Sequence, residues 1–273
     1  MICDLLVHVS GDNSGRRRAV LAIELAVSMG ARLAGMHIKP PPEIAPGYWP
    51  RGIDVAMATR EATLTREASI AKANFLEATA HSSANSTWSE GAGEIARGIS
   101  DRARFADLVI LGQNEAQEPA ERHPLPMAHS VVLMCGRPVL VVPVETQTLV
   151  PAKVAVAWDG GREAVRAVHD ALPILKLAQS IDIVTMAKRS EDAGVGNVDD
   201  LIAHLAHHGI SAIHRLERFE LSDEHTSLLN IVANGYDLIV MGGYSHPKWV
   251  EFIFGGPTIS ALLSSKIPVL VSH

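Results

Sequence analysis

Residues 107–112 read Asp-Leu-Val-Ile-Leu-Gly, and residues 237–242 read Asp-Leu-Ile-Val-Met-Gly. A second pair of segments has the same spacing of 130 residues, because Pro-Val-Leu-Val occurs at residues 138–141 and again at 268–271. Two matches at one spacing, with no gap between them, indicate an internal duplication. The 273-residue chain is therefore predicted to consist of two related halves, each of ordinary domain size.

The two halves also begin alike. Residues 5–11 (Leu-Leu-Val-His-Val-Ser-Gly) resemble residues 154–160 (Val-Ala-Val-Ala-Trp-Asp-Gly), here at a spacing of 149 residues. The first half is longer by the difference between the spacings, 19 residues, and its proline-rich segment 39–53 is the expected insertion, a loop. A polar linker is expected near Glu145 to Pro151. The predicted domains are residues 1–145 and 152–273.

Short runs rich in Val, Ile and Leu alternate with helix-length segments in both halves. Strands are predicted at residues 4–9, 32–38, 86–89, 107–112, 138–142, 153–157, 180–186, 211–217, 237–242 and 267–271. Helices are predicted at residues 16–29, 56–82, 92–104, 126–135, 161–178, 197–208, 223–234 and 257–265. Unbroken apolar strands between helices are typical of parallel sheets covered on both faces. The predicted class is α/β, with two tandem open doubly wound parallel sheets of Rossmann-like type; a single barrel fits a twofold repeat less well.

Composition excludes several classes of protein. Apolar residues make up 47% and charged residues 20% of the chain, as in ordinary globular proteins. The net charge of −6 disfavours nucleic acid as a partner, and no apolar run reaches the roughly 18 residues of a membrane span. Cys3 and Cys135 lie in apolar runs and are expected to be buried thiols. We predict a cytoplasmic protein that binds neither nucleic acid nor membrane.

The carboxyl ends of two strands in the second half carry the residues best placed to bind a ligand. Strand 153–157 ends in Trp158-Asp159-Gly160-Gly161, and strand 237–242 leads into a segment that closes with Gly255-Gly256-Pro257-Thr258 before a predicted helix. Open α/β sheets bind ligands at such ends. Glycines let a backbone approach phosphate, and free amides at a helix start attract anions. A phosphate-containing ligand is indicated, with Asp159 as a candidate acceptor for ribose hydroxyls.

At these residues the sequence resembles the universal stress protein family in its tandem two-domain form, over nearly the whole chain. Nucleotide-binding members carry Gly, two residues, Gly, nine residues, then Gly-Ser or Gly-Thr. This chain has Gly242, Ser245, Gly255 and Gly256 at those positions, so the second glycine and the hydroxyl residue are replaced. The resemblance implies an adenine nucleotide alpha hydrolase-like fold. It also implies ATP or another adenine nucleotide in the second half, with Mg²⁺ as a candidate companion.

The resemblance also implies roles for single residues. Asp159 matches the aspartate that contacts the adenosine part, and Val184 matches the adenine-wall position. The predicted binding residues all lie at the strand ends or in the glycine-containing segment: Ala157, Trp158, Asp159, Val184, Met241, Gly242, Ser245, His246, Gly255, Gly256, Pro257 and Thr258. The alternative is a pseudo-dimeric scaffold that binds no nucleotide and acts through protein partners. The replacements at Ser245 and Gly256, and the amide donor lost at Pro257, favour it.

The first half lacks these features. Ser10 stands where the second half has Asp159. The segment that corresponds to the glycine-containing loop carries three acidic residues, Glu115, Glu118 and Glu121. Their charges would repel phosphates, so we expect no nucleotide in this half. The segment 10–15 is expected to form a turn with a helix cap.

The remaining polar residues are assigned structural roles. Asp107 and Asp237 are expected to cap or turn locally, and Arg16 to Arg18 to form a solvated helix face. His204, His207 and His208 have the helical spacing that could present imidazoles to zinc. No carboxylate or cysteine completes a coordination shell, so a solvated face is again expected and no metal is predicted.

No catalytic motif is present, since the chain has neither a Gly-x-Ser-x-Gly elbow nor a Walker loop. We expect no enzymatic activity beyond slow, incidental ATP hydrolysis. The family resemblance further implies that the two halves pair pseudo-symmetrically through their last strands. A homo-oligomer and unidentified protein partners are further candidates for assembly.

Overall fold

The computed structural model describes residues 1–42, 53–113, 127–188, 197–219, 235–243 and 265–273. The first half contains strands β1 (Asp4–His8), β2 (Arg32–Lys39), β3 (Ser86–Ala92), β4 (Leu108–Gly112) and β5 (Val139–Val142). Its helices are α1 (Asn13–Met29), α2 (Ile53–Thr79), α3 (Ile95–Ala103) and α4 (Met127–Cys135). The second half contains β6 (Lys153–Ala157), β7 (Ser180–Lys188), β8 (Ile213–Phe219), β9 (Leu238–Gly242) and β10 (Val269–Ser272), with α5 (Arg162–Leu175) and α6 (Val198–His207).

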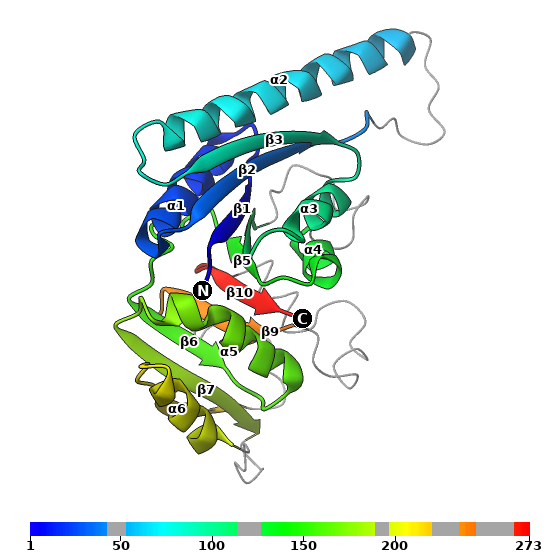
Figure 1. Cartoon of the computed structure of the whole chain (residues 1–273). Coiled ribbons are helices and arrows are strands. Elements are labelled where there is room, and N and C mark those ends of the chain that lie inside the picture. The colour runs from blue at the N-terminus through cyan, green and yellow to red at the C-terminus, as the bar shows by residue number, and fades with distance from the viewer. Residues whose placement is uncertain (43–52, 114–126, 189–196, 220–234, 244–264) are drawn as a thin grey trace.

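One sheet runs through both halves (Figure 1). Its ten strands have the order β3-β2-β1-β4-β5-β10-β9-β6-β7-β8, so each half has the same internal order and the two orders run in opposite directions. All neighbours within a half are parallel. The predicted α/β class is confirmed. The two predicted sheets join where β5 and β10 pair antiparallel, with Leu140 opposite Leu270, as the family resemblance implied.

Helix ends follow the sequence signals. The Asp12 carboxylate accepts a hydrogen bond from Gly15 N at 2.8 Å and so caps α1, as the predicted turn requires. Gly30 ends α1 with a left-handed φ of 64°, which glycine adopts without strain. Residues 143–152, which include the predicted linker, form neither helix nor strand. Most of the proline-rich insertion, all of the predicted helix 223–234 and nearly all of the predicted helix 257–265 lie outside the described residues.

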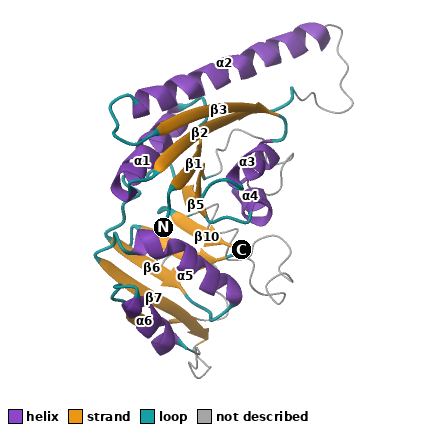
Figure 2. Cartoon of the chain, in the orientation of Figure 1, coloured by secondary structure: helices purple, strands orange, loops and turns teal. Residues whose placement is uncertain are grey.

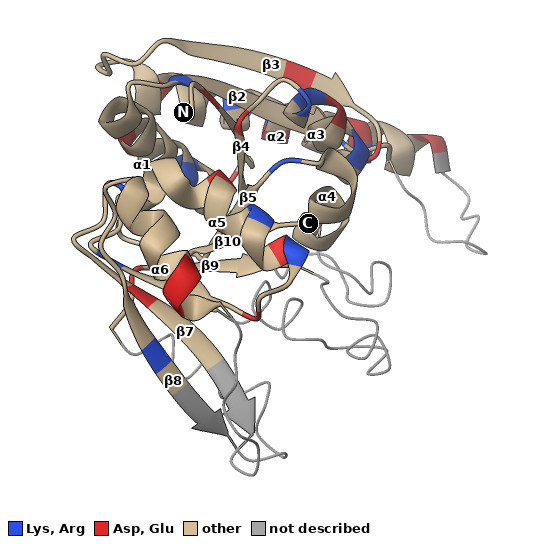
Figure 3. Ribbon diagram, turned by 60° about the horizontal axis from the view of Figure 1, so that its bottom comes forward, with Lys and Arg blue, Asp and Glu red and all other residues tan. Residues whose placement is uncertain are grey.

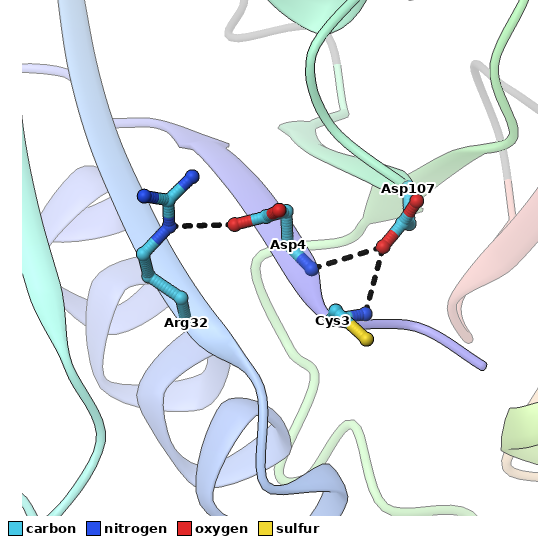
Figure 4. A network of polar contacts seen from close by, with 4 residues as sticks. All are labelled: Cys3, Asp4, Arg32 and Asp107. Carbon is cyan, nitrogen blue, oxygen red and sulfur yellow. Dashed lines mark hydrogen bonds and ion pairs between the residues drawn. The ribbon is translucent and has the colours of Figure 1, made fainter.

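The two halves make the same polar contact at the amino edge of the sheet. Asp107 Oδ2 accepts hydrogen bonds from Cys3 N at 2.7 Å and Asp4 N at 3.0 Å (Figure 4). In the second half, Asp237 Oδ2 accepts from Ala152 N at 3.0 Å and Lys153 N at 2.8 Å. The expectation of local caps was wrong, because adjacent parallel strands start at the same edge. The carboxylate before one strand therefore reaches the free amides at the start of its neighbour.

Helices cover both faces of the sheet, and an apolar cluster lies under each layer (Figure 2). One cluster packs beneath α1, α2, α5 and α6 and includes Leu5 and Val154. The other packs beneath α3 and α4 and includes Leu6 and Ala155, the next residues along the same strands. This alternation places successive side chains on opposite faces. Each cluster contains residues of both halves, so the core is continuous across the β5–β10 junction.

Surface charge, helix hydropathy and the two cysteines can be compared with the sequence predictions. Figure 3 shows acidic and basic residues interspersed over the described helices and strands. No helix in the described part of the chain combines the length and apolar character that crossing a membrane requires. Cys3 is exposed, contrary to expectation, because it precedes β1 at the edge of the sheet, whereas Cys135 is buried and burial raises the pKa of its thiol.

Candidate functional site

The order of strands in the second half reverses between β6 and β9, and ligands of open α/β sheets bind at the carboxyl edge of such a point. Ala157, the last residue of β6, pairs with Val184 on one side and Met241 on the other. Three predicted site residues therefore lie side by side across β7, β6 and β9. Val184 is buried and lies four residues before the end of β7, which continues to Lys188.

Asp159 is exposed between the end of β6 and the start of α5. Its Oδ1 accepts a hydrogen bond from Gly161 N at 2.8 Å, and Gly161 is the residue that precedes the first turn of α5. The hydrogen bond fixes the carboxylate beside a helix start at the carboxyl edge of the sheet. This is where the sequence placed an acceptor for ribose hydroxyls.

Gly242, the last residue of β9, touches the first turn of α5. A Cβ atom at this position would lie 2.5 Å from Ala164 N and 2.6 Å from the Glu163 carbonyl carbon, closer than real side chains come to backbone. Glycine is therefore required by the close approach of strand and helix. The contact brings the end of β9, the start of α5 and Asp159 to one edge.

Glu163 belongs to the same edge, and the sequence reasoning did not select it. Its side chain is buried in the first turn of α5 and accepts a hydrogen bond from Arg162 Nε. Burial acts to raise the pKa of Glu163, but the Arg162 hydrogen bond, a hydrogen bond to its own backbone and the charges of Arg162 and His273 together hold that pKa below its usual range. A buried, ionised carboxylate thus lies next to Gly242. An acidic residue near a helix start was readable from sequence, but its burial was not.

Two buried polar atoms at this edge have no hydrogen-bond partner among the described residues: Trp158 Nε1 and Ser272 Oγ. Trp158 follows Ala157 in the chain, and Ser272 lies beside Gly242 in the sheet register. A buried polar group without a partner costs free energy unless water or a ligand satisfies it. Both atoms are therefore candidates for contacts that the described protein groups do not supply.

The segment predicted to hold phosphate lies outside the described residues. This applies to six of the predicted site residues: Ser245, His246, Gly255, Gly256, Pro257 and Thr258. The structure therefore brings together Ala157, Trp158, Asp159, Val184, Met241 and Gly242. The other six stay sequence predictions.

Solved structures with the same architecture cover almost the entire chain. A universal stress protein from Archaeoglobus fulgidus DSM 4304 matches with a TM-score of 0.68 at 15% identity, over 99% of this chain and 96% of that one. A functionally unknown protein from Pseudomonas aeruginosa PAO1 matches with a TM-score of 0.55 at 14% identity, over 99% and 92%. The chain has the tandem universal stress protein fold. No family model and no curated protein matches its sequence.

Within this universal stress protein fold, the first half fills its own switch point with side chains. Arg18 is 4% exposed, and its guanidinium donates to His8 O at 2.8 Å and Ser10 Oγ at 3.1 Å. The His8 and His37 rings stack with centroids 5.9 Å apart. At the spacing of 149 residues, Arg18 and His8 correspond to alanines, Ala167 and Ala157.

The expectation that Arg16 to Arg18 are all solvated was therefore wrong for Arg18, which faces the end of β1. At positions 8 and 18 the first half carries an imidazole and a guanidinium where the second half carries methyl groups, and the His37 ring stacks on that of His8. The acidic residues Glu115, Glu118 and Glu121, which also argued against phosphate binding, lie outside the described residues.

The structure regroups the histidines of α6. The His204 ring contacts the ring of His208, the residue that follows the end of α6, and that of His169 on α5, with centroids 4.8 and 5.0 Å apart. His207 is exposed, and His214 Nε2 lies 2.8 Å from Thr185 Oγ1. Within the described residues, no three metal-ligating side chains are arranged to hold a metal ion. His169 could not be found from the spacing along α6 because it comes from another helix.

Proposed function

We propose that the chain is a cytoplasmic universal stress protein that binds ATP, ADP or AMP in its second half and acts in the stress response. The observation that carries the proposal is the contact between Gly242 and the first turn of α5 beside Asp159. It gathers a glycine strand end, a helix start and a carboxylate at the switch point. These are the features by which open α/β sheets bind nucleotides.

The described residues suggest how a nucleotide would lie. Asp159 holds the adenosine part, since its carboxylate is exposed and held at the sheet edge. Arg162 and Glu163 form an ion pair at the start of α5, so their charges balance and offer no net positive charge to phosphates there. The phosphates therefore belong with the segment after Gly242, where Ser245, Gly255, Gly256 and Thr258 contribute. Mg²⁺, where it accompanies the nucleotide, neutralises phosphate charge.

We propose no catalytic role for this site beyond slow, incidental hydrolysis. Sustained turnover of ATP requires a group that positions or activates water at the terminal phosphate. The carboxylate of Glu163 is buried and engaged by Arg162, and Asp159 accepts from the Gly161 amide. We assign that task to neither residue. The nucleotide therefore acts as a bound ligand that stabilises the folded chain, and not as a substrate.

A scaffold without nucleotide is the second candidate. The ion pair of Arg162 and Glu163 beside Gly242 favours it, because the charge of Arg162 is balanced by Glu163 and adds no net attraction for phosphate at this edge. In that case the chain acts through protein partners, with its two halves as a built-in pseudo-dimer. A homo-oligomer is a further assembly to be tested in either case.

Calorimetry on the purified, nucleotide-stripped chain with Mg²⁺ present tests the proposal. We expect one adenine-nucleotide site per chain with micromolar affinity. Asp159→Ala should weaken binding more than about tenfold, a loss of about 1.4 kcal/mol. Ser10→Ala, at the corresponding position of the first half, should leave the affinity unchanged. Two sites would show that the first half binds as well. An absence of binding at millimolar ATP would leave the scaffold.

A further inference from the structure

Three histidines from two helices form a cluster on the face of the second half covered by α5 and α6. His169 is exposed on α5, while His204 on α6 and His208, which directly follows α6, are half-buried. The His204 ring stands between the other two, at 5.0 Å from His169 and 4.8 Å from His208. These ring contacts join the two helices next to the apolar residues that dock α6, Leu201 and Leu205.

The arrangement suits neutral imidazoles and not charged ones. The rings meet at angles of 50° and 66°, as aromatic rings pack edge to face. His204 Nε2 is buried and has no hydrogen-bond partner among the described residues, so no described group compensates a charge there. Two imidazolium ions at these separations would repel each other, and burial would add a desolvation cost.

The surrounding charges add to this preference. Burial lowers the pKa of His208, and the charges of His204, Lys176, His169 and His207 lower it further. Every one of these neighbours is basic. The carboxylates nearest in sequence are Asp170 on α5, which forms an ion pair with Arg166 at 3.7 Å, and Asp199 and Asp200 in the first turn of α6.

We propose that His169, His204 and His208 form a pH-sensitive contact that holds α6 against α5 while the rings are neutral and loosens it when they are protonated. Because the pKa of His208 is lowered in the folded state, this residue binds a proton more readily once α6 has opened. The contact is therefore intact above the ordinary histidine pKa of about 6.5 and weakens as the pH falls below it. The proposal does not depend on nucleotide binding.

Amide hydrogen exchange of the full chain at pH 7.5 and 5.5 tests this, with rates corrected for the intrinsic effect of pH. We expect the opening of α6, relative to that of β1, to increase severalfold from pH 7.5 to pH 5.5. The β1 amides report global unfolding, so the ratio isolates the local event. The triple variant His169→Gln, His204→Gln, His208→Gln should lose the extra response, and His81→Gln, at an exposed position of the first half, should keep it.

The single variant His169→Gln, at an exposed position, serves if the triple variant does not fold, and it should reduce the response. The proposal is overturned if the opening of α6 relative to β1 does not increase between pH 7.5 and pH 5.5, or if the glutamine variants respond like the wild type. Zn²⁺ added at pH 7.5 must not protect α6 further. If Zn²⁺ protects α6 in the wild type but not in the triple variant, the three histidines form a metal site and the proposed pH-sensitive contact is wrong.

Discussion

The imidazole of His8 is buried at a position where no described group accepts a hydrogen bond that would stabilise its protonated form. The side chain is 7% exposed, neither ring nitrogen has a partner among the described residues, and it stacks on His37. Burial, followed by the charges of Arg18 and His37, lowers the pKa of His8 to about 3, against a smaller opposing effect of Asp12. The folded chain therefore keeps His8 neutral at pH values where the unfolded chain protonates it.

We predict that this residue alone removes about 1.4 kcal/mol of unfolding free energy between pH 7.5 and pH 5.5. Stability falls as pH drops below about 6.5, because only the unfolded state binds the proton. Denaturant titrations at the two pH values measure the loss. His8→Ala, which installs the residue that the second half carries at Ala157, should flatten the pH dependence whatever it does to stability at pH 7.5. An unchanged slope would contradict the assignment.

Single residues are where sequence reasoning was weakest. Asp159 and Gly242 could be placed because Asp159 comes two residues after a strand of predictable length and Gly242 ends another. Arg18 and Glu163 could not, since a charged residue in the first turns of a helix is ordinarily solvated and only the three-dimensional contact buries it. Both buried charges lie at the carboxyl edges of the sheet, one in each half.

At the scale of elements, Asp107 and Asp237 each join two neighbouring strands by the same hydrogen bonds, so the two contacts can be compared within one molecule. Asp107→Ala and Asp237→Ala each leave two backbone amides at the start of a strand without their acceptor. We expect each variant to lose about 1–3 kcal/mol of unfolding free energy, and the two losses to be similar. Asp101→Ala, which removes only an exposed pair with Arg104, should lie within about 1 kcal/mol of wild type. Denaturant midpoints measure all three. A loss at one aspartate only would show that the halves are not equivalent here.

Elements as such were predictable because strand and helix periods are local. Strand 153–157 was predicted with its observed bounds, and α4 and β4 to within one residue. Contacts between elements were not, because they depend on which strands become neighbours. The local caps expected of Asp107 and Asp237 proved to be bridges between strands, and the partner of His204 proved to be a residue of α5.

At the scale of the molecule, the continuous sheet predicts that the two halves unfold together. Leu270 and Leu140 face each other across the antiparallel junction and are both almost fully buried. Both apolar clusters extend through this junction, so separation of the halves would expose core residues of each. The expected behaviour is one cooperative transition followed equally by probes in β1 and β6.

Leu270→Ala tests this coupling, with an expected loss of about 2–5 kcal/mol from lost burial and the cavity left behind. If the sheet is one cooperative unit, hydrogen exchange should accelerate in β1 as much as in β6, although the substitution lies in the second half. Leu76→Ala on α2, at a position 50% exposed, should change neither strand by a comparable amount. Protection lost in β6 but kept in β1 would mean that the halves unfold independently. The two repeats would then be separate folding units. A ligand bound to the second half would stabilise that half and leave the stability of the first half unchanged.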